Sequence, residues 1–224
     1  MRLNKYIAQS GYCSRRTADQ LIESGRVSVN GTPITKLGHQ INPINDKVKV
    51  EGNKISLPLS KTYIAFYKPR GILSTMSTES NSLLVHTEKM RVPGLFHVGR
   101  LDQESEGLLL LSNDGDWANR ITHPKYQIEK EYLVSLTGEL SMIDFSRLTE
   151  GVELEDGLFR ADSAVKMGDR RIKLVIHDGR NRVIRRVFET LGYRVDELKR
   201  VRIGSIELGK MRPGEWKELE SSSI

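Results

Sequence analysis

Residues 99–115, Gly-Arg-Leu-Asp-Gln-Glu-Ser-Glu-Gly-Leu-Leu-Leu-Leu-Ser-Asn-Asp-Gly, place a polar loop centred on Asp102 directly before an apolar run. The run Leu108–Leu111 follows a glycine and precedes Asn-Asp-Gly, which is a strong turn signal. An apolar run bounded in this way is typical of a buried strand. A carboxylate on a loop beside such a strand has the rigid support that a catalytic group needs, although most loop aspartates only cap turns. Residues elsewhere in the chain must decide between these two interpretations of Asp102.

The composition is that of a globular protein. The chain has 224 residues, of which 38% are hydrophobic and 29% charged, enough for a small domain and a medium one. No apolar stretch reaches the roughly 18–20 residues that cross a membrane, and the first residues do not resemble a secretory signal. Cys13 is the only cysteine, which excludes an internal disulfide. We therefore expect a cytoplasmic protein that neither contacts membranes nor, with five scattered histidines, binds a metal.

Positive charge is concentrated at the start of the chain. Residues 1–58 contain nine Lys/Arg against four Asp/Glu, whereas the whole chain contains 35 against 29. Most of the formal net charge of +6 therefore lies in the first quarter of the sequence. This distribution favours an anionic partner that is bound mainly by the N-terminal region.

The N-terminal region has the signals of a small helical and stranded module. Leu3, Tyr6 and Ile7 share one helical face, and Ser14 is a good N-cap for a second helix. Asn-Gly at residues 30–31 predicts a hairpin over residues 27–34, and a third strand follows at 47–50. Residues 51–61 have the composition of a linker. We therefore predict one domain over residues 1–58, with the linker from about 51, and a second over 62–224.

The second domain is predicted to be an α+β sheet domain. Ser141 and Asp144 predict a short capped helix, and the tight apolar stripe of 181–191 predicts the clearest helix of the chain. The strands come in runs with few crossover helices between them, which argues against a doubly wound fold. The predicted strands are 62–66, 107–112, 131–136, 172–177, 195–200 and 205–208.

Several basic and aromatic residues have two interpretations each. A basic helix followed by a hairpin can hold RNA by its phosphates, or it can simply be a solvated face. Tyr132 can stack on a base or be an ordinary strand aromatic. Among the arginines that follow residue 179, Arg182 lies opposite the apolar stripe, while Arg185 is best placed to turn inward as a counter-ion. The candidate RNA contacts are Arg2, Lys5, Arg15, Arg16, Arg26, Lys68, Arg180 and Arg182.

Taken together, these motifs resemble two known families. Arg-Leu-Asn-Lys-Tyr-Ile at 2–7, Cys-Ser-Arg-Arg-Thr-Ala at 13–18 and Gly-Arg-Val-Ser-Val-Asn-Gly at 25–31 resemble the alpha-L RNA-binding domain. Lys-Pro at 68–69, Gly-Arg-Leu-Asp at 99–102, Tyr132 and Gly-Arg-Asn-Arg-Val-Ile-Arg-Arg at 179–186 resemble the RsuA/RluB branch of the RluA-type pseudouridine synthases. This resemblance implies a small helix-helix-three-strand RNA-binding domain followed by a larger mixed, largely antiparallel catalytic sheet flanked by helices and loops.

The resemblance also implies an activity and roles for individual residues. Members of the family convert a uridine in RNA to pseudouridine without a cofactor or a metal. By resemblance, Asp102 is the catalytic carboxylate, through attack on C1′ or a glycal route, and Arg185 is its counter-ion. Tyr132 packs on the uracil, and Arg100 fills the place that the flipped nucleotide leaves.

The motif at 179–182 is closer to the enzymes that modify large-subunit ribosomal RNA, and small-subunit RNA is the alternative target. The expected partner is ribosomal RNA or a precursor subunit, bound by a monomer. A non-catalytic ribosome-assembly factor is the rival function, because the N-terminal domain alone would support RNA binding. Another RNA-modifying enzyme, such as a methyltransferase, would need a glycine-rich cofactor loop after a strand, which we do not find in the sequence.

Overall fold

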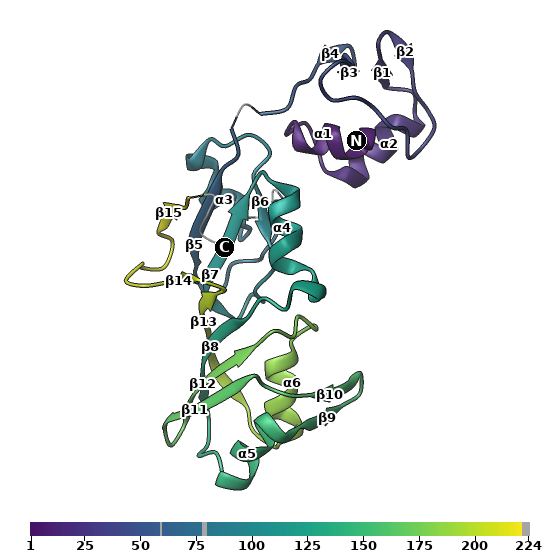
Figure 1. Cartoon of the computed structure of the whole chain (residues 1–224). Coiled ribbons are helices and arrows are strands. Elements are labelled where there is room, and N and C mark those ends of the chain that lie inside the picture. The colour runs from purple at the N-terminus through teal and green to yellow at the C-terminus, as the bar shows by residue number, and fades with distance from the viewer. Residues whose placement is uncertain (59, 78–79, 221–224) are drawn as a thin grey trace. The chain divides into compact units, whose positions relative to one another are not determined.

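The chain forms two compact units in a computed structural model that describes residues 1–58, 60–77 and 80–220 (Figure 1). The first unit contains residues 1–62, 90–96 and 112–115, and the second contains the remaining residues. Residue 59 of the predicted linker, and residues 78–79 and 221–224 of the predicted second domain, lie outside the described part. No helix among the described residues is both long and apolar enough to cross a membrane.

The first unit has the two helices and the strands that the sequence predicts. The Ser14 hydroxyl accepts a 3.1 Å hydrogen bond from the backbone N–H of Thr17, as expected of an N-cap. Asn30 and Gly31 both have positive φ, 51° and 88°, which the predicted hairpin requires. Only the last short strand was missed, because two residues after a glycine turn carry no alternation. The elements are α1 (Leu3–Gln9), α2 (Arg15–Glu23), β1 (Val27–Val29), β2 (Thr32–Pro33), β3 (Val48–Val50) and β4 (Asn53–Lys54), with strand order β2-β1-β3-β4.

The second unit is built on a nine-stranded sheet within the described residues, with the order β11-β12-β8-β13-β7-β5-β15. Strands β6 and β14 pair with β7 and β13. The pairs β11–β12, β12–β8, β8–β13 and β5–β15 are antiparallel, whereas β13–β7 is parallel, so the predicted mixed α+β sheet is confirmed. The strands are β5 (Tyr63–Lys68), β6 (Phe96–Val98), β7 (Glu106–Ser112), β8 (Lys130–Leu136), β11 (Ser163–Gly168), β12 (Arg171–Ile176), β13 (Val195–Ile203), β14 (Ile206–Glu207) and β15 (Trp216–Glu218).

In one half of this sheet, β5 and β7 are covered on both faces. The rings of Tyr63 and Trp117 are 4.9 Å apart, and those of Phe66 and His86 are 5.9 Å apart. Because Tyr63 and Phe66 point to opposite faces of β5, helices α4 (Gly115–Thr122) and α3 (Leu83–Thr87) cover the two sides. Burial on both faces explains why β7 is a continuous leucine run. The short 3-10 turns η1 (Glu88–Met90) and η2 (Pro124–Tyr126) complete this half.

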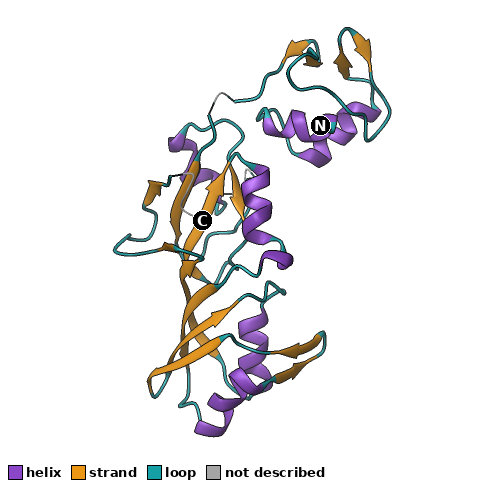
Figure 2. Ribbon diagram, in the orientation of Figure 1, coloured by secondary structure: helices purple, strands orange, loops and turns teal. Residues whose placement is uncertain are grey.

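The other half packs β8, β12 and β13 against two predicted helices, α5 (Met142–Glu150) and α6 (Val183–Thr190), as Figure 2 shows. The Ser141 hydroxyl accepts a 3.1 Å hydrogen bond from the Asp144 N–H, which is the predicted cap. Helix α6 buries Val183, Ile184 and Val187 on its predicted stripe, but it begins two residues later than expected. The hairpin of β9 (Val152–Leu154) and β10 (Gly157–Phe159) was not predicted.

The two halves meet where β13 runs parallel to β7. Two register pairs define this ladder, Lys199 with Glu106 and Arg200 with Gly107. Gly107 has a φ of +105°, and a Cβ there would lie 2.2 Å from the carbonyl oxygen of Arg200. We call this short ladder the seam; its close backbone approach requires a glycine on β7.

Candidate active site

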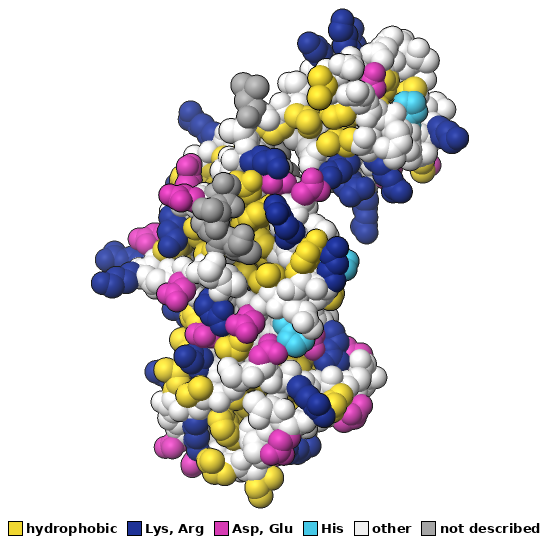
Figure 3. Space-filling model, viewed as in Figure 1, with side chains coloured by type: hydrophobic (Ala, Val, Ile, Leu, Met, Phe, Trp, Pro, Cys, Tyr) yellow, Lys and Arg dark blue, Asp and Glu magenta, His cyan; other side chains and the backbone are white. Residues whose placement is uncertain are grey.

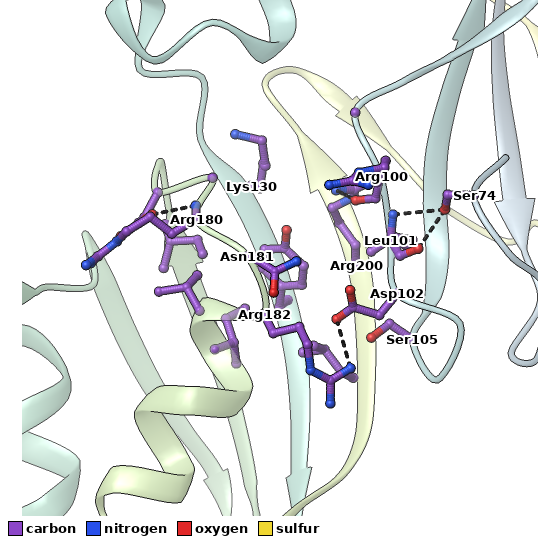
Figure 4. A pocket seen from close by; sticks show the side chains of 18 of the residues that line it. Ser74, Arg100, Leu101, Asp102, Ser105, Lys130, Arg180, Asn181, Arg182 and Arg200 are labelled. Carbon is purple, nitrogen blue, oxygen red and sulfur yellow. Dashed lines mark hydrogen bonds and ion pairs between the residues drawn. The ribbon is translucent and has the colours of Figure 1, made fainter. Parts of the chain in front are cut away.

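A cavity of about 670 Å³ lies in the second unit, where both halves of the sheet contribute to its wall (Figure 4). This volume is in the range of small-molecule and nucleotide sites. One side is the loop of residues 99–105, and the other is formed by β8, β13, the loop of residues 178–182 and the start of α6. Asp102, Arg100, Tyr132, Arg180 and Arg182, all singled out from the sequence, line this one cavity.

Asp102 is held by hydrogen bonds to the backbone on both sides of it. The Leu101 N–H donates to Ser74 Oγ at 3.1 Å, and that hydroxyl donates back to the Leu101 carbonyl at 2.6 Å. The Ser105 N–H donates to the Asp102 carbonyl at 3.0 Å. The Asp102 side chain is 30% exposed and faces the cavity (Figure 4). These bonds fix the loop without using the carboxylate, which stays available to a ligand.

The structure gives Asp102 a different arginine from the one expected. Arg182 Nη1 lies 3.7 Å from Asp102 Oδ2, whereas the inward-turned Arg185 contacts Glu104 Oε2 at 3.7 Å and Ser105 Oγ at 3.3 Å. Burial lowers the pKa of Arg185, and the charges of Glu104 and Asp102 oppose that effect. The helical spacing placed Arg182 on the solvent side, but Arg182 precedes α6 with a left-handed φ of 49°. Because Arg182 lies outside the helix, helical spacing does not predict the direction of its side chain.

Lys68 is also corrected: its position does not fit the predicted RNA contact. The side chain is fully buried, and its Nζ donates to the carbonyls of Pro69 and Ser105 at 2.9 Å and 2.7 Å. Burial lowers the pKa of Lys68 to about 8, and the charges of Asp102 and Glu106 partly oppose that shift. Lys68 therefore supports the Asp102 loop from below.

The buried Lys68 predicts a pH-dependent stability. The folded protein releases the Lys68 proton near pH 8, whereas the unfolded chain holds it until about pH 10.5. The unfolded state therefore binds more protons between these values, and the Lys68 contribution to the free energy of unfolding rises with pH in this window. The stability difference between wild type and Lys68→Met should increase by at most about 1.4 kcal/mol per pH unit.

Urea unfolding between pH 7 and pH 10.5 measures this difference. Lys217→Met is the matched control, because Lys217 is exposed on β15. Equal slopes for the two variants would contradict the argument from burial.

Arg180, a predicted RNA contact, lines the cavity and is bound to several protein acceptors. Its guanidinium donates to Asp178 Oδ2 at 2.7 Å, to Asp156 Oδ1 at 2.9 Å and to the Gly157 carbonyl at 2.9 Å. The hydrogen bond with Asp178 raises the pKa of Arg180. Because protein acceptors already occupy these donors, Arg180 fixes the β9–β10 turn against the cavity wall.

Tyr132 and Arg100 both line the cavity, and their expected roles stay predictions. Tyr132 is buried on β8 and lines the cavity, with the Arg200 Cζ 6.0 Å from its ring centre. Arg100 is exposed and lies on the same loop as Asp102. An aromatic ring inside the cavity and an exposed long cation in its lining fit a site that takes up one nucleobase from a chain.

Two further cations line the cavity that the sequence analysis did not single out, Lys130 and Arg200. Lys130 Nζ donates to the Ile128 carbonyl at 3.0 Å, and burial lowers its pKa, with the charge of Arg200 adding to the effect. Alternation along β13 gave a usable signal, because Arg200 lies on the same face as the buried Leu198. An arginine at an inward-facing strand position is rarely a plain surface charge.

The N-terminal candidates lie in the other unit. Arg2, Arg15, Arg16 and Arg26 are exposed, and Lys5 is half-buried. Arg26 Nη1 forms a 3.0 Å ion pair with Glu51 on the surface. Figure 3 shows Lys and Arg side chains distributed over this unit on the face in view. No group of three or more His, Cys, Asp or Glu that could hold a metal occurs within residues 1–58, 60–77 and 80–220.

Comparisons with known proteins match both parts of the chain. Residues 62–190 match the family model of RNA pseudouridylate synthase, and residues 1–48 match that of the S4 domain. An uncharacterized RNA pseudouridine synthase of Mycobacterium tuberculosis is 40% identical over 232 residues, 100% of this chain and 91% of the relative. The ribosomal large subunit pseudouridine synthase B of Vibrio vulnificus is 40% identical over 100% of this chain and 73% of its own length. A crystal structure of a pseudouridylate synthase matches with a TM-score of 0.73 and 29% identity, covering 99% of this chain and 97% of that one.

Proposed function

The chain belongs to the RNA pseudouridylate synthase family, and we therefore propose that it converts a specific uridine of large-subunit ribosomal RNA to pseudouridine. The observation that carries this proposal is the Asp102 carboxylate, held by its backbone at a cavity of nucleotide size and facing a cation at 3.7 Å. A fixed carboxylate at the wall of a pocket is what glycosidic chemistry on a retained base needs.

The reaction breaks the C1′–N1 bond of uridine and forms a C1′–C5 bond. In our proposal Asp102 acts at the sugar, either by attack on C1′ or through a glycal route. Tyr132 packs on the uracil, and the cavity retains the detached base while it rotates. The C5 proton leaves, and N1 gains a proton, so the product is an isomer of the substrate. Arg100 fills the space in the RNA from which the nucleotide has flipped.

The two arginines near Asp102 have different proposed roles. Arg182 is placed as the counter-ion at the carboxylate, and Arg185 holds the loop through Glu104 and Ser105. We propose that the enzyme acts in the cytoplasm as a monomer, without cofactor or metal.

RNA docking is proposed for the N-terminal domain, over residues 1–58, ahead of a catalytic domain over 62–224. The S4 match over residues 1–48 and the exposed Arg15 and Arg16 at the start of α2 support this assignment. Flipping a nucleotide costs a few kcal/mol, and phosphate contacts made elsewhere offset that cost.

The large-subunit target rests on the motif at 179–182 and on the name of the Vibrio relative. The test is tritium release from large-subunit and small-subunit ribosomal RNA labelled at uridine C5, presented as naked RNA and as precursor particles. Release from large-subunit RNA alone is the expected result. Release from small-subunit RNA instead would show that small-subunit RNA is the target. Binding of both RNAs without any release would favour a non-catalytic assembly factor.

The docking role predicts a change in salt dependence. Replacing Arg15 and Arg16 together by alanine should lower the slope of log K against log salt by about 1.5–2, because each lost phosphate contact removes close to one released counterion. Filter binding of ribosomal RNA between 50 and 300 mM salt measures the slope. The matched control replaces Arg170 and Arg171, two adjacent exposed arginines of the second unit. An equal loss of slope in both variants would contradict docking by α2.

A further inference from the structure

Arg200 occupies the centre of the sheet, at the seam. Arg200 lies on β13, where its register partners are Gly107 on β7 and Tyr132 on β8. The β8–β13 register shifts between Arg200 and Arg202, and such bulges often redirect a side chain beside an active site. Arg200 is only 3% exposed, and it lines the cavity beside the Asp102 loop (Figure 4).

The guanidinium of Arg200 is held rigidly, but its charge is not neutralised. Its Nε donates to the Leu108 carbonyl at 2.7 Å, and its Nη1 donates to the Arg100 carbonyl at 3.4 Å. Its Nη2 is buried and finds no acceptor, and no carboxylate forms an ion pair with it, within the part of the chain that the structure describes. A buried cation with an unused donor is unfavourable in the free protein. The arrangement is explained if the partner arrives with the substrate.

The surroundings indicate which part of an RNA substrate meets Arg200. The exposed cations Arg100 and Arg182 are on the solvent side of the cavity, where a ribose-phosphate chain remains. Arg200 lies deeper, over the ring of Tyr132, and the apolar Ile176 and Leu198 also line the cavity. A flat, largely apolar base fits these walls better than a phosphate, which would be desolvated there.

We propose that Arg200 is a catalytic residue that binds the uracil ring and stabilises its negative charge while the base is detached from the ribose. This proposal rests on the proposed function. When the C1′–N1 bond breaks, the bonding electron pair stays on N1 of the uracil and is delocalised onto O2 and O4. Arg200 donates a hydrogen bond from Nη2 to one of these oxygens and exchanges no proton. Its fixed charge is almost fully buried, and such stabilisation is stronger away from water.

The charge on the base gives a selective test. Fluorine at C5 withdraws electrons and stabilises the uracil anion, so 5-fluorouridine is a better leaving group than uridine. Arg200→Met should slow single-turnover cleavage of target uridine about 10²–10³-fold, as loss of one oxyanion donor does. On RNA with 5-fluorouridine at the target position, the loss should be at least about tenfold smaller, because the anion needs less help. Arg200→Lys, which keeps the charge but not the planar fork, should lie between wild type and Arg200→Met.

Mass spectrometry of nuclease digests follows the loss of uridine or 5-fluorouridine from saturating enzyme–RNA complexes. The ratio of the two rates within one preparation is independent of the fraction of protein that is folded. The matched control is Arg202→Met on the same strand, whose partners Glu129 and Glu131 lie outside the cavity. The ratio of its rates on uridine and 5-fluorouridine should equal the ratio for wild type.

Two results would overturn the role of Arg200. Equal losses on both substrates would make it a structural residue, and a weaker RNA affinity with an unchanged rate in the bound complex would make it a phosphate contact. If wild type itself makes no pseudouridine on any ribosomal RNA, the proposed function fails instead.

Discussion

Asp102→Asn is expected to lower tritium release from C5-labelled ribosomal RNA by at least about 10⁴-fold, as removal of a central catalytic group does. The amide keeps the shape of the carboxylate but has neither its charge nor its nucleophilicity. RNA affinity should persist, because the bonds that fix the loop involve Ser74, Ser105 and backbone atoms of Leu101 and Asp102. Tritium release and filter binding on the same preparation separate the two effects.

Glu104→Gln is the control for this prediction. Glu104 lies on the same loop and contacts Arg182 and Arg185 at 3.3 Å and 3.7 Å, but it is more exposed than Asp102 and does not line the cavity. The substitution removes one negative charge beside the same two arginines and leaves the proposed reaction centre unchanged. A loss as large as that of Asp102→Asn would show that the loop needs charge in general and that Asp102 has no special role.

Gly107→Ala is expected to lower the free energy of unfolding by about 4–5 kcal/mol, near the upper end for single substitutions. Two costs act together. Alanine is strained at a φ of +105°, and its Cβ would lie 2.2 Å from the carbonyl oxygen of Arg200. Because that atom belongs to the backbone, no side-chain rotation relieves the clash, and β7 and β13 must separate.

Gly157→Ala separates these two costs. Gly157 has nearly the same φ, +107°, but nothing lies within 4 Å of the position of its Cβ. It should therefore show only the conformational strain, about 1–3 kcal/mol. Urea unfolding of both variants gives the difference, which isolates the close approach at the seam. Equal destabilisation would mean that the seam tolerates a Cβ.

Local signals account for the parts of the fold that the sequence predicts. The leucine run of β7, the apolar stripe of α6 and the Asn-Gly turn each specify an element without help from distant residues. Helix α4 was missed because it begins at Gly115, inside a turn signal. Strand β11 was missed because it is partly exposed and owes its existence to pairing with β12. The parallel pairing of β13 with β7 joins distant segments, and no local pattern encodes it.

The candidate site follows the same division. The motif resemblance selected Asp102 and Tyr132, and the structure brings both to one cavity. The exact roles of the cations were harder to predict, because each depends on acceptors from other parts of the chain. The buried Lys68 donates a hydrogen bond to the distant Ser105 carbonyl. Arg182 lies close to Asp102 because its backbone is left-handed. Neither contact has a signature within a few residues of the side chain concerned.

The seam also determines when the reaction centre comes into existence during folding. Asp102 belongs to the half-sheet of β7, whereas Tyr132 and Arg200 belong to the half-sheet of β13, and two register pairs join them. Each half contains its own helices, whereas the seam joins residues as far apart in the chain as Glu106 and Lys199, and closing such a loop carries an entropic cost that local contacts do not. We therefore expect the centre to form late in folding. A slight separation of the halves would abolish activity while most helices and strands persist. Activity should therefore report loss of the native structure earlier than helix or strand content does.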